Sequence, residues 1–343
     1  MSTNNTDIQY KSHRVLAGQA ARKSTDKIRW AVCGLGRIQK TFLEALTMVD
    51  RAVVVACASS DIGRAKDFAK AHNIEYAYTY EELYKADGID AVYVASNMNL
   101  HHDNTIGALR GGKAVLCEKS FCLTDTEALR MIETAKDSGT LLMEAMWTKF
   151  LPSTQRVLEL TLSKELGDIT DIHVPFEAHF GDQPNSRVFS KELGGGSILD
   201  LGVYAAAYAH MLLGVPRSMT VTGKVVDGVD HDCIYTLLYP TNVIAHLSSS
   251  LIRPYKATAT INYTNGRIIV PEFFSAKAIE IHHANGTVDK QGFENIAGFV
   301  YQIQHFCELI KSGQKQSPIH SLSDTLEVMR ILTQAQRQLG MLE

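Results

Sequence analysis

Short apolar runs alternate with helical patterns from residue 27 to residue 146. The apolar runs span 28–33, 52–58, 89–95, 114–117 and 141–144. The helical patterns between them span 38–49, 62–72, 80–84, 100–110 and 124–137. Apolar strands that are continuous rather than half polar, with helices between them, predict a parallel sheet covered on both faces. A doubly wound sheet of this kind binds its ligand at the carboxyl ends of the strands.

The pattern changes after Trp147. Segments rich in Val, Thr and Tyr, separated by short turns, span 169–180, 219–226, 234–239, 243–251, 257–263, 266–270 and 278–282. Helical patterns span 152–163, 198–213, 296–312 and 323–339. This half predicts a large mixed, mostly antiparallel sheet with helices on one face. We therefore expect a polar tail over 1–26, an α/β Rossmann domain over 27–147 and an α+β domain over 148–343.

Composition excludes several classes of function. The chain carries 34 Lys plus Arg and 37 Asp plus Glu, so its net charge of −3 gives no bulk attraction for nucleic acid or an anionic membrane. No apolar run approaches the roughly 18 uncharged residues of a membrane span. The six cysteines lack zinc or redox spacing, and three lie in apolar runs, which favours reduced thiols in a cytoplasmic protein.

The first 26 residues are polar and have no apolar segment of the kind that a secretory signal needs. We favour a disordered tail or an arm that packs on a partner subunit. Because this stretch carries Arg and Lys with few acids, a transit peptide stays open as an alternative.

A glycine-rich turn follows the first apolar run and opens a helix. In that context glycines let the backbone approach a pyrophosphate, whose charge is stabilised at the helix N-terminus. The third small residue of the full dinucleotide motif is replaced by Gln39, so a plain strand-to-helix turn is the alternative. The candidate cofactor contacts here are Gly34, Leu35, Gly36, Arg37 and Ile38.

The end of the second strand indicates which cofactor is bound. Enzymes that use NAD usually place an acid there for the ribose hydroxyls. This chain has Ser59 and Ser60, with Asp61 one step late and Arg64 beyond it. Hydroxyls and a guanidinium suit a 2′-phosphate, so we expect NADP, with NAD possible. A solvated helix residue is the alternative role for Arg64.

Two further segments carry chemistry. Lys119 follows the strand 114–117 at the ligand-binding edge of the sheet. Three glycines at 194–196 open a helix in which Asp200 and Tyr204, four residues apart, share one face. The alternative is an ordinary acid near a helix N-terminus with a packed tyrosine one turn later.

Together these motifs resemble the Gfo/Idh/MocA oxidoreductases. The likeness is strongest to the branch of dimeric dihydrodiol dehydrogenases, NADP-dependent D-xylose dehydrogenases and 1,5-anhydrofructose reductase-like proteins. It covers about residues 27–343. The segments that carry it are 34–36, 57–61, 97–101, 118–119, 143–148, 194–196, 200–204, 317–318 and 328–332.

The resemblance implies a catalytic group of Lys119, Asp200 and Tyr204, which also bind substrate together with Trp147. Tyr204 would be the general acid or base, with Lys119 lowering its pKa from about 10. Because the nicotinamide carries the hydride, no metal is needed. The substrate would be a sugar, an anhydro-sugar or a cyclic diol or ketone, and the protein a homodimer through its C-terminal sheet. Further implied cofactor contacts are Ser96, Asn97, Asn99, His101 and Glu118.

Three residues depart from the family pattern around this site. Ser120 and Asn97 stand where the family usually has Pro, and Gln39 where it has a small residue. Loss of two rigid φ angles can shift the cofactor or Lys119. The alternative function is therefore a non-catalytic dinucleotide sensor, although such a protein has no need of Lys119, Asp200 and Tyr204.

Two other features are weighed here. The adjacent His101 and His102 point to different sides of a helix and make a poor metal chelate. Arg187 lies in the polar segment 181–191, which can form a loop on the substrate side. We favour an exposed loop residue as the role of Arg187.

Overall fold

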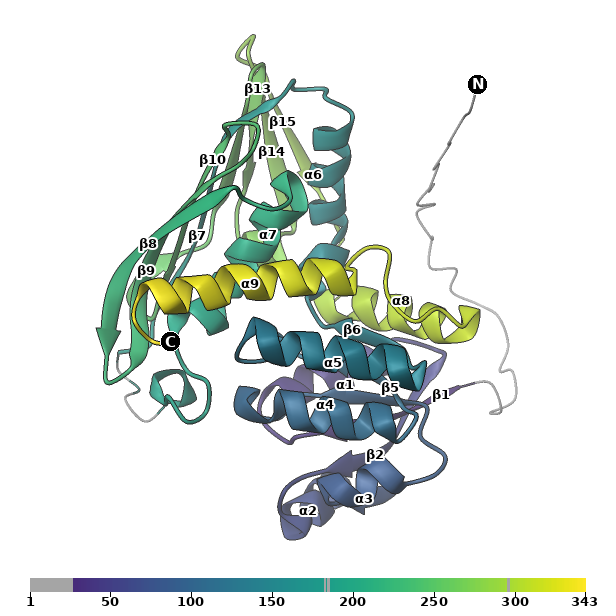
Figure 1. Ribbon diagram of the computed structural model, residues 1–343. Coiled ribbons are helices and arrows are strands. Elements are labelled where there is room, and N and C mark those ends of the chain that lie inside the picture. The colour runs from purple at the N-terminus through teal and green to yellow at the C-terminus, as the bar shows by residue number, and fades with distance from the viewer. Residues whose placement is uncertain (1–26, 182, 184–185, 295–296) are drawn as a thin grey trace.

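The structure is a computed structural model that describes residues 27–181, 183, 186–294 and 297–343. It contains a smaller sheet flanked by helices and a broad, twisted sheet above it (Figure 1). The tail predicted for residues 1–26 lies outside the described residues, and the boundary predicted at residue 147 stays a prediction.

The first sheet is parallel and has the strand order β3-β2-β1-β4-β5-β6. Every residue of its central strands β4 and β5 is buried, as expected for strands covered on both faces. The prediction of a doubly wound parallel sheet is confirmed. The strands are β1 Ile28–Cys33, β2 Ala52–Ala58, β3 Tyr76–Tyr78, β4 Ala91–Val94, β5 Ala114–Cys117 and β6 Leu142–Glu144.

Helices cover this sheet on both faces. On one face, Trp30 and Phe42 pack with Phe306, which comes from α8 near the end of the chain. On the other face, α4 and α5 contribute Leu109 and Met131 to the core. The helices of this half are α1 Ile38–Thr47, α2 Ile62–His72, α3 Tyr80–Lys85, α4 His101–Arg110 and α5 Asp125–Ser138.

The second sheet has the order β15-β14-β13-β12-β7-β10-β9-β8, with β11 also paired to β7. Its pairs are antiparallel except β7 with β10, which confirms the mixed, mostly antiparallel prediction. The strands are β7 Ile169–His179, β8 Ser218–Val226, β9 Val229–Leu238, β10 Ile244–Ser250, β11 Ile252–Lys256, β12 Ala259–Tyr263, β13 Gly266–Val270, β14 Ala278–His283 and β15 Val288–Gly292.

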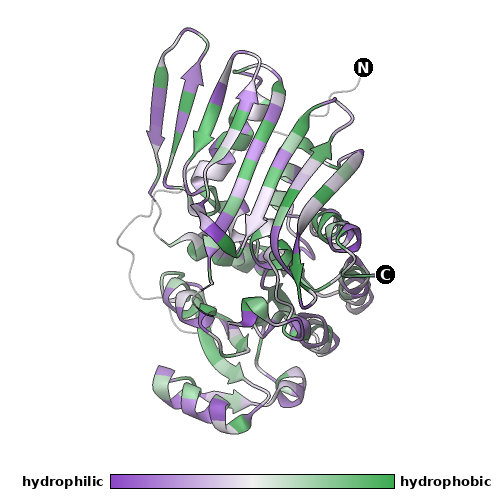
Figure 2. Ribbon diagram, turned by 90° about the vertical axis from the view of Figure 1, so that its left-hand side faces the viewer, coloured by the Kyte–Doolittle hydropathy of each residue, from purple (hydrophilic) through white to green (hydrophobic). Residues whose placement is uncertain are grey.

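One face of the second sheet packs against α7 and α9. Along β10, Ala245 and Leu247 point inward and are buried, whereas Ile244 and His246 are exposed. Figure 2 views this sheet face-on and shows polar and apolar residues alternating along its strands. The apolar side of β10 therefore packs against a helix. The helices of this half are α6 Pro152–Leu162, α7 Val203–Leu213, α8 Gly298–Ser312 and α9 Leu322–Gln338.

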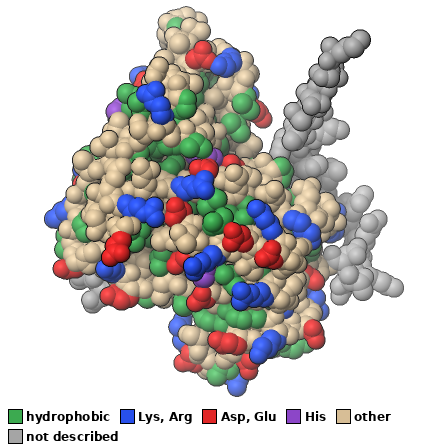
Figure 3. Space-filling model, in the orientation of Figure 1, with side chains coloured by type: hydrophobic (Ala, Val, Ile, Leu, Met, Phe, Trp, Pro, Cys, Tyr) green, Lys and Arg blue, Asp and Glu red, His purple; other side chains and the backbone are tan. Residues whose placement is uncertain are grey.

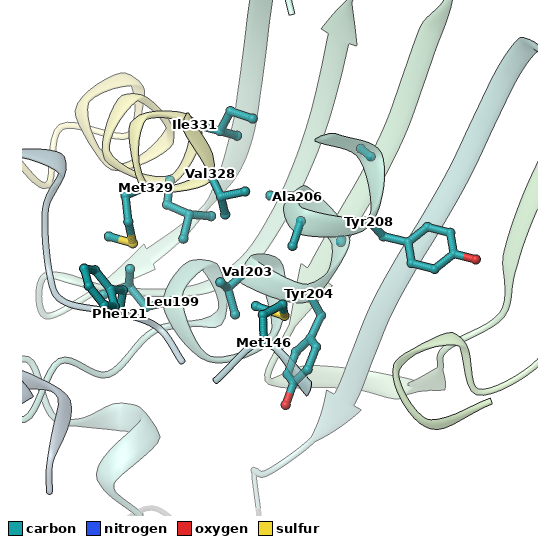
Figure 4. Packing of buried hydrophobic residues seen from close by; sticks show 14 of the residues in the cluster. Phe121, Met146, Leu199, Val203, Tyr204, Ala206, Tyr208, Val328, Met329 and Ile331 are labelled. Carbon is teal, nitrogen blue, oxygen red and sulfur yellow. The ribbon is translucent and has the colours of Figure 1, made fainter. Parts of the chain in front are cut away.

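The helix predicted over 198–213 is divided in the structure. Residues Ile198–Gly202 form a π-helical turn, and α7 continues from Val203. Figure 4 shows α7 packed beside α9, with the Tyr204 ring at the edge of the apolar cluster. All six cysteines are free and buried. In the described part of the chain, no helix has the length and apolar character required to cross a membrane.

Candidate active site

A cavity of about 1080 Å³ lies beside the carboxyl ends of the strands of the first sheet. It brings together residues from the turn after β1, the segments after β4 and β5, and the π-helical turn Ile198–Gly202 before α7. The predicted site residues that line it are Gly36, Arg37, Ile38, Ser96, Asn97, His101, Glu118, Lys119, Trp147, Asp200 and Tyr204. The predicted residues that do not line it are Gly34, Leu35, Ser59, Ser60, Arg64 and Asn99.

The turn after β1 is shaped for close backbone approach. Gly34 has a φ of +94°, and a Cβ there would lie 2.4 Å from the backbone of Ser96. Arg37, which precedes α1, makes no side-chain cap, so the helix N-terminus keeps its partial positive charge for an anion. These features fit the pyrophosphate of a dinucleotide.

The acid that follows the end of β2 caps the next helix. The Asp61 carboxylate accepts hydrogen bonds from the backbone N–H groups of Gly63 and Arg64, at 2.7 and 3.1 Å, and so caps α2. Ser60 is exposed, and the Arg64 guanidinium reaches the Leu35 carbonyl oxygen at 3.4 Å. The Arg64 cation therefore lies beside the turn after β1, residues 34–37, which we call the phosphate-loop turn.

Lys119 and Asp200 form the charged centre of the cavity. Lys119 Nζ donates to the Asp200 carbonyl oxygen at 2.8 Å and to its Oδ1 at 3.4 Å. Arg187 Nη2 donates to the same Oδ1 at 2.8 Å. Burial raises the pKa of Asp200, but the two cations outweigh it and hold that pKa at about 2. Arg187 is exposed, as expected, but it also lines the cavity and pairs with Asp200.

Tyr204 lies against this charged pair. Its hydroxyl accepts a hydrogen bond from Trp147 Nε1 at 3.1 Å, and Lys119 Nζ lies 4.8 Å from its ring centroid. Burial raises the pKa of the phenol more than the Lys119 charge lowers it. The net direction is upward, opposite to the direction that the sequence led us to expect. Burial also opposes the charged form of Lys119, but Asp200 and Tyr204 outweigh it and the pKa of this lysine is raised.

Buried polar residues support the segment that carries Lys119. Tyr93 donates to Glu118 Oε1 at 2.5 Å, and burial raises the pKa of Glu118 to about 7. The His101 ring contacts the carbonyl oxygens of Ser96 and Ser120 at 3.1 and 2.9 Å, so it joins the segments after β4 and β5. Burial lowers the pKa of His101 to about 4, so at neutral pH the ring is uncharged and its single N–H donates to one of these two carbonyl oxygens.

The π-helical turn that carries Asp200 is held from the second sheet. Asp230 on β9 is fully buried, and its Oδ2 accepts from Ser197 Oγ at 2.6 Å and from the Ile198 backbone N–H at 2.7 Å. A Cβ at Gly196 would lie 2.1 Å from Asp230 Oδ1, which accounts for glycine at that position. The glycine at position 196 therefore lets the Asp230 carboxylate of β9 reach the start of the π-helical turn.

Several residues that line the cavity escape the sequence analysis. Phe299 belongs to α8, which is more than 150 residues from Trp147 in the chain, yet their rings stack at 5.4 Å. No local pattern links such distant segments. The other unpredicted lining residues are Thr41, Ala95, Met98, Gln183 and Ser186. Within the described ranges, no three His, Cys, Asp or Glu side chains are grouped so that they could hold a metal ion.

Comparison with known proteins identifies the family. Residues 28–146 match the oxidoreductase family with an NAD-binding Rossmann fold, GFO_IDH_MocA, and residues 154–269 match the GFO/IDH/MocA C-terminal domain. The chain belongs to the Gfo/Idh/MocA family. It is an NAD(P)-dependent oxidoreductase, as the resemblance implied.

Similar Gfo/Idh/MocA proteins align along nearly the whole chain. The trans-1,2-dihydrobenzene-1,2-diol dehydrogenase of Xenopus tropicalis is 34% identical over 91% of this chain and 98% of its own length. The Homo sapiens enzyme of the same name is 30% identical over 91% and 97%. A 3-ketoreductase from Actinomadura kijaniata, solved with NADP and TDP-benzene, is 25% identical with a TM-score of 0.80 over 89% and 96%.

Proposed function

We propose that the protein is an NADP-dependent oxidoreductase that acts on the carbinol carbon of a sugar, an anhydro-sugar or a cyclic diol, or on the matching ketone. The observation that carries this proposal is the meeting of Lys119, Asp200 and Tyr204 in the cavity that also contains the phosphate-loop turn. A binding-only protein has no use for a cation, a carboxylate and a phenol grouped in this way.

The residues divide the chemistry as follows. The nicotinamide, when bound, supplies or accepts the hydride. Tyr204 takes the hydroxyl proton during oxidation and returns it during reduction, while Lys119 stabilises the phenolate form. Asp200 orients the substrate hydroxyls. Because burial raises the pKa of Tyr204 on balance, alcohol oxidation should speed up as pH rises, since it needs the phenolate.

Three observations support NADP over NAD. Asp61 comes one residue later than the usual ribose-binding acid, and its Oδ1 is taken up in capping α2. Ser60 after β2 and Arg64 in the first turn of α2 are exposed, and they offer a hydroxyl and a cation to a 2′-phosphate. The similar 3-ketoreductase from Actinomadura kijaniata was solved with NADP.

A ring-shaped substrate suits the walls around Tyr204. Trp147 and Phe299 both line the cavity, their ring centroids lie 5.4 Å apart, and Trp147 Nε1 donates to the Tyr204 hydroxyl at 3.1 Å. Flat apolar walls pack on the apolar face of a ring, while Asp200 and Lys119 bind its hydroxyls. The curated relatives named above act on a cyclic vicinal diol by their names, which fits such a pocket.

We also infer a homodimer that forms through the exposed face of the second sheet, where Ile234 and Ile244 are exposed. Light scattering of the purified chain tests this inference, and a monomer at micromolar concentration would contradict it. Six free, buried thiols agree with a cytoplasmic location.

A substrate panel tests the proposed function. The purified chain is mixed with NADP⁺ or NAD⁺ and D-xylose, D-glucose, cyclohexane-1,2-diol or trans-1,2-dihydrobenzene-1,2-diol, and nicotinamide absorbance is followed. We expect turnover of at least one compound, faster with NADP⁺ and increasing with pH. Tight NADPH binding without turnover of any compound, in either direction, would favour the dinucleotide sensor instead.

A further inference from the structure

Asp200 is shared by two cations that approach the same oxygen. Arg187 Nη2 lies 2.8 Å from Oδ1, whereas Lys119 Nζ lies 3.4 Å from it. The side chains of Asp200 and Lys119 are 10% and 14% exposed, so this contact is little screened by water, while Arg187 is 42% exposed. The closer partner of the carboxylate is therefore the arginine, which the proposed chemistry does not use.

We propose that Arg187 is a positioning residue that holds the Asp200 carboxylate and so keeps the Lys119 ammonium available to Tyr204. This inference rests on the proposed function, in which Lys119 stabilises the Tyr204 phenolate. A buried lysine beside a single carboxylate forms a closed ion pair with it. A second cation on the same oxygen weakens that attraction and leaves Lys119 over the Tyr204 ring, where it lies now.

The backbone fixes Arg187 relative to the π-helical turn. Arg187 begins the short 3-10 turn Arg187–Phe189, whose Val188 is buried. The Val188 carbonyl oxygen accepts from the Gly196 N–H at 2.9 Å. A Cβ at Gly195 would lie 2.6 Å from the same carbonyl oxygen, so this close approach requires glycine. Backbone contacts therefore join the turn that carries Arg187 to the glycines at 194–196 before Asp200.

The chemistry of arginine suits this role. A guanidinium stays charged at every working pH and directs its donors in a rigid plane, so it holds a carboxylate in one orientation. Its charge also repels the nearby ammonium and so offsets part of the rise that Asp200 and Tyr204 give the pKa of Lys119. If Arg187 is removed, the whole charge of Asp200 acts on Lys119, and we expect the lysine to be more firmly protonated and more tightly paired.

Trace acetylation of single lysines tests this role without any substrate. The full chain, with and without saturating NADPH, is labelled with acetic anhydride at a fixed mildly alkaline pH. Mass spectrometry then gives the rate at Lys119 relative to the exposed Lys66. The variants are Arg187→Met, Arg187→Gln and Arg187→Lys. The matched control is Lys191→Met, which removes a cation from an exposed position of the same segment.

We expect Lys119 to react about tenfold more slowly in Arg187→Met and Arg187→Gln, with Arg187→Lys in between and Lys191→Met unchanged. With any substrate found in the panel, kcat should fall in Arg187→Met while the NADPH Kd stays the same. Unchanged or faster labelling in a folded Arg187→Met or Arg187→Gln protein would overturn the inference. Failure of the oxidoreductase proposal would be seen in the panel assay, not in this labelling.

Discussion

At two positions where this chain departs from its family pattern, the side chain forms a buried hydrogen bond. Gln39 is fully buried, and its Nε2 donates to the Ala95 carbonyl oxygen at 2.8 Å, which ties α1 to the end of β4. Ser120 is also fully buried, and its Oγ donates to the Leu199 carbonyl oxygen at 2.6 Å. The second bond joins the Lys119 segment to the turn that carries Asp200. The Ser120 side chain therefore supports the neighbouring Lys119. The family usually has a proline in place of Ser120, and its ring would restrict the backbone there.

The residue that we expect to select the cofactor is Ser60. Ser60→Asp places a carboxylate beside Arg64, where it would repel a 2′-phosphate and could bind ribose hydroxyls. We expect NADP binding to weaken about tenfold more than NAD binding, measured as Kd values by fluorescence titration. Ser218→Asp, an exposed serine on β8, is the matched control. Equal weakening of both cofactors would show that the end of β2 does not select between them.

For single residues, the sequence predicts which ones belong to the site better than it predicts what they contact. Lys119, Asp200 and Tyr204 were found because two motifs flank them, and they line one cavity. The polar surroundings of Arg187 predict its exposure correctly, but they give no sign of its partner Asp200. The direction of the Tyr204 pKa was missed since burial is a property of the packed molecule, and it outweighs the lysine charge.

Among the secondary-structure elements, a strand of the second sheet supports the π-helical turn Ile198–Gly202, which precedes α7. Asp230 on β9 binds Ser197 and the Ile198 N–H, and Ser197 Oγ also contacts Ser249 Oγ of β10 at 3.0 Å. Tyr235 joins this network through Ser249 at 2.9 Å. The orientation of the turn is thus set by two strands rather than by helix capping alone.

The Asp230 carboxyl should make stability depend on pH. Burial raises the pKa of Asp230 from 3.8 to about 6, although the bonds from Ser197 and Ile198 oppose this. A raised pKa in the folded state favours the protonated form, so this stabilisation is complete below pH 3.8 and is lost as pH rises through about 6.

Asp230→Asn removes that titration. We therefore expect the free energy of unfolding of the wild-type protein to fall relative to that of Asp230→Asn between pH 3.8 and about 6, measured by urea denaturation at several pH values. A difference that stays constant over this range, or that grows in favour of the wild type, would contradict the assignment.

Element prediction succeeded where the apolar pattern was strong. The helix α2 and the strands β1, β2, β5 and β13 have the predicted bounds. The strand β15 was missed because its sequence Val-Asp-Lys-Gln-Gly is polar and largely exposed. The strand β11 was missed because it contains a proline and has three exposed residues out of five. The π-helical turn depends on Asp230 and on packing, which no spacing of residues encodes.

At the scale of the whole molecule, the end of the chain returns to the cofactor-binding half. The helix α8 covers one face of the first sheet beside α1, and α9 lies between α5 and α7 (Figure 1). At the start of α8, a Cβ on Gly298 would lie 2.2 Å from the Trp147 ring. The helix α8 therefore closes part of the cavity wall through Phe299, whose ring stacks on that of Trp147.

Gly298→Ala tests this coupling. A methyl group at Gly298 would push the Trp147 ring and disturb its hydrogen bond to Tyr204. We expect the rate of turnover to fall roughly tenfold to a hundredfold, with NADPH binding retained. The matched control is Gly292→Ala, where a Cβ would meet no atom within 4 Å. Equal rates in the two variants would show that α8 does not position Trp147.

The packing of the two halves against each other is the feature that the sequence predicts least. Each sheet was predicted from its own pattern, but the docking of α8 on the first sheet depends on contacts between residues far apart in the chain. The small net charge of −3 agrees with the intermingled basic and acidic side chains that Figure 3 shows on one face. The charges that matter for the ligand are instead the few that line the cavity.

The most direct test of the account is the hydride-transfer rate of Tyr204→Phe in a single turnover, compared with Tyr208→Phe. Tyr208 is a buried tyrosine one turn later on the same helix, and it does not line the cavity. We predict that Tyr204→Phe and Lys119→Met each lose about a hundredfold or more, while Tyr208→Phe stays near the wild-type rate and all three bind NADPH. A near-wild-type rate in Tyr204→Phe would contradict the proposed proton transfer.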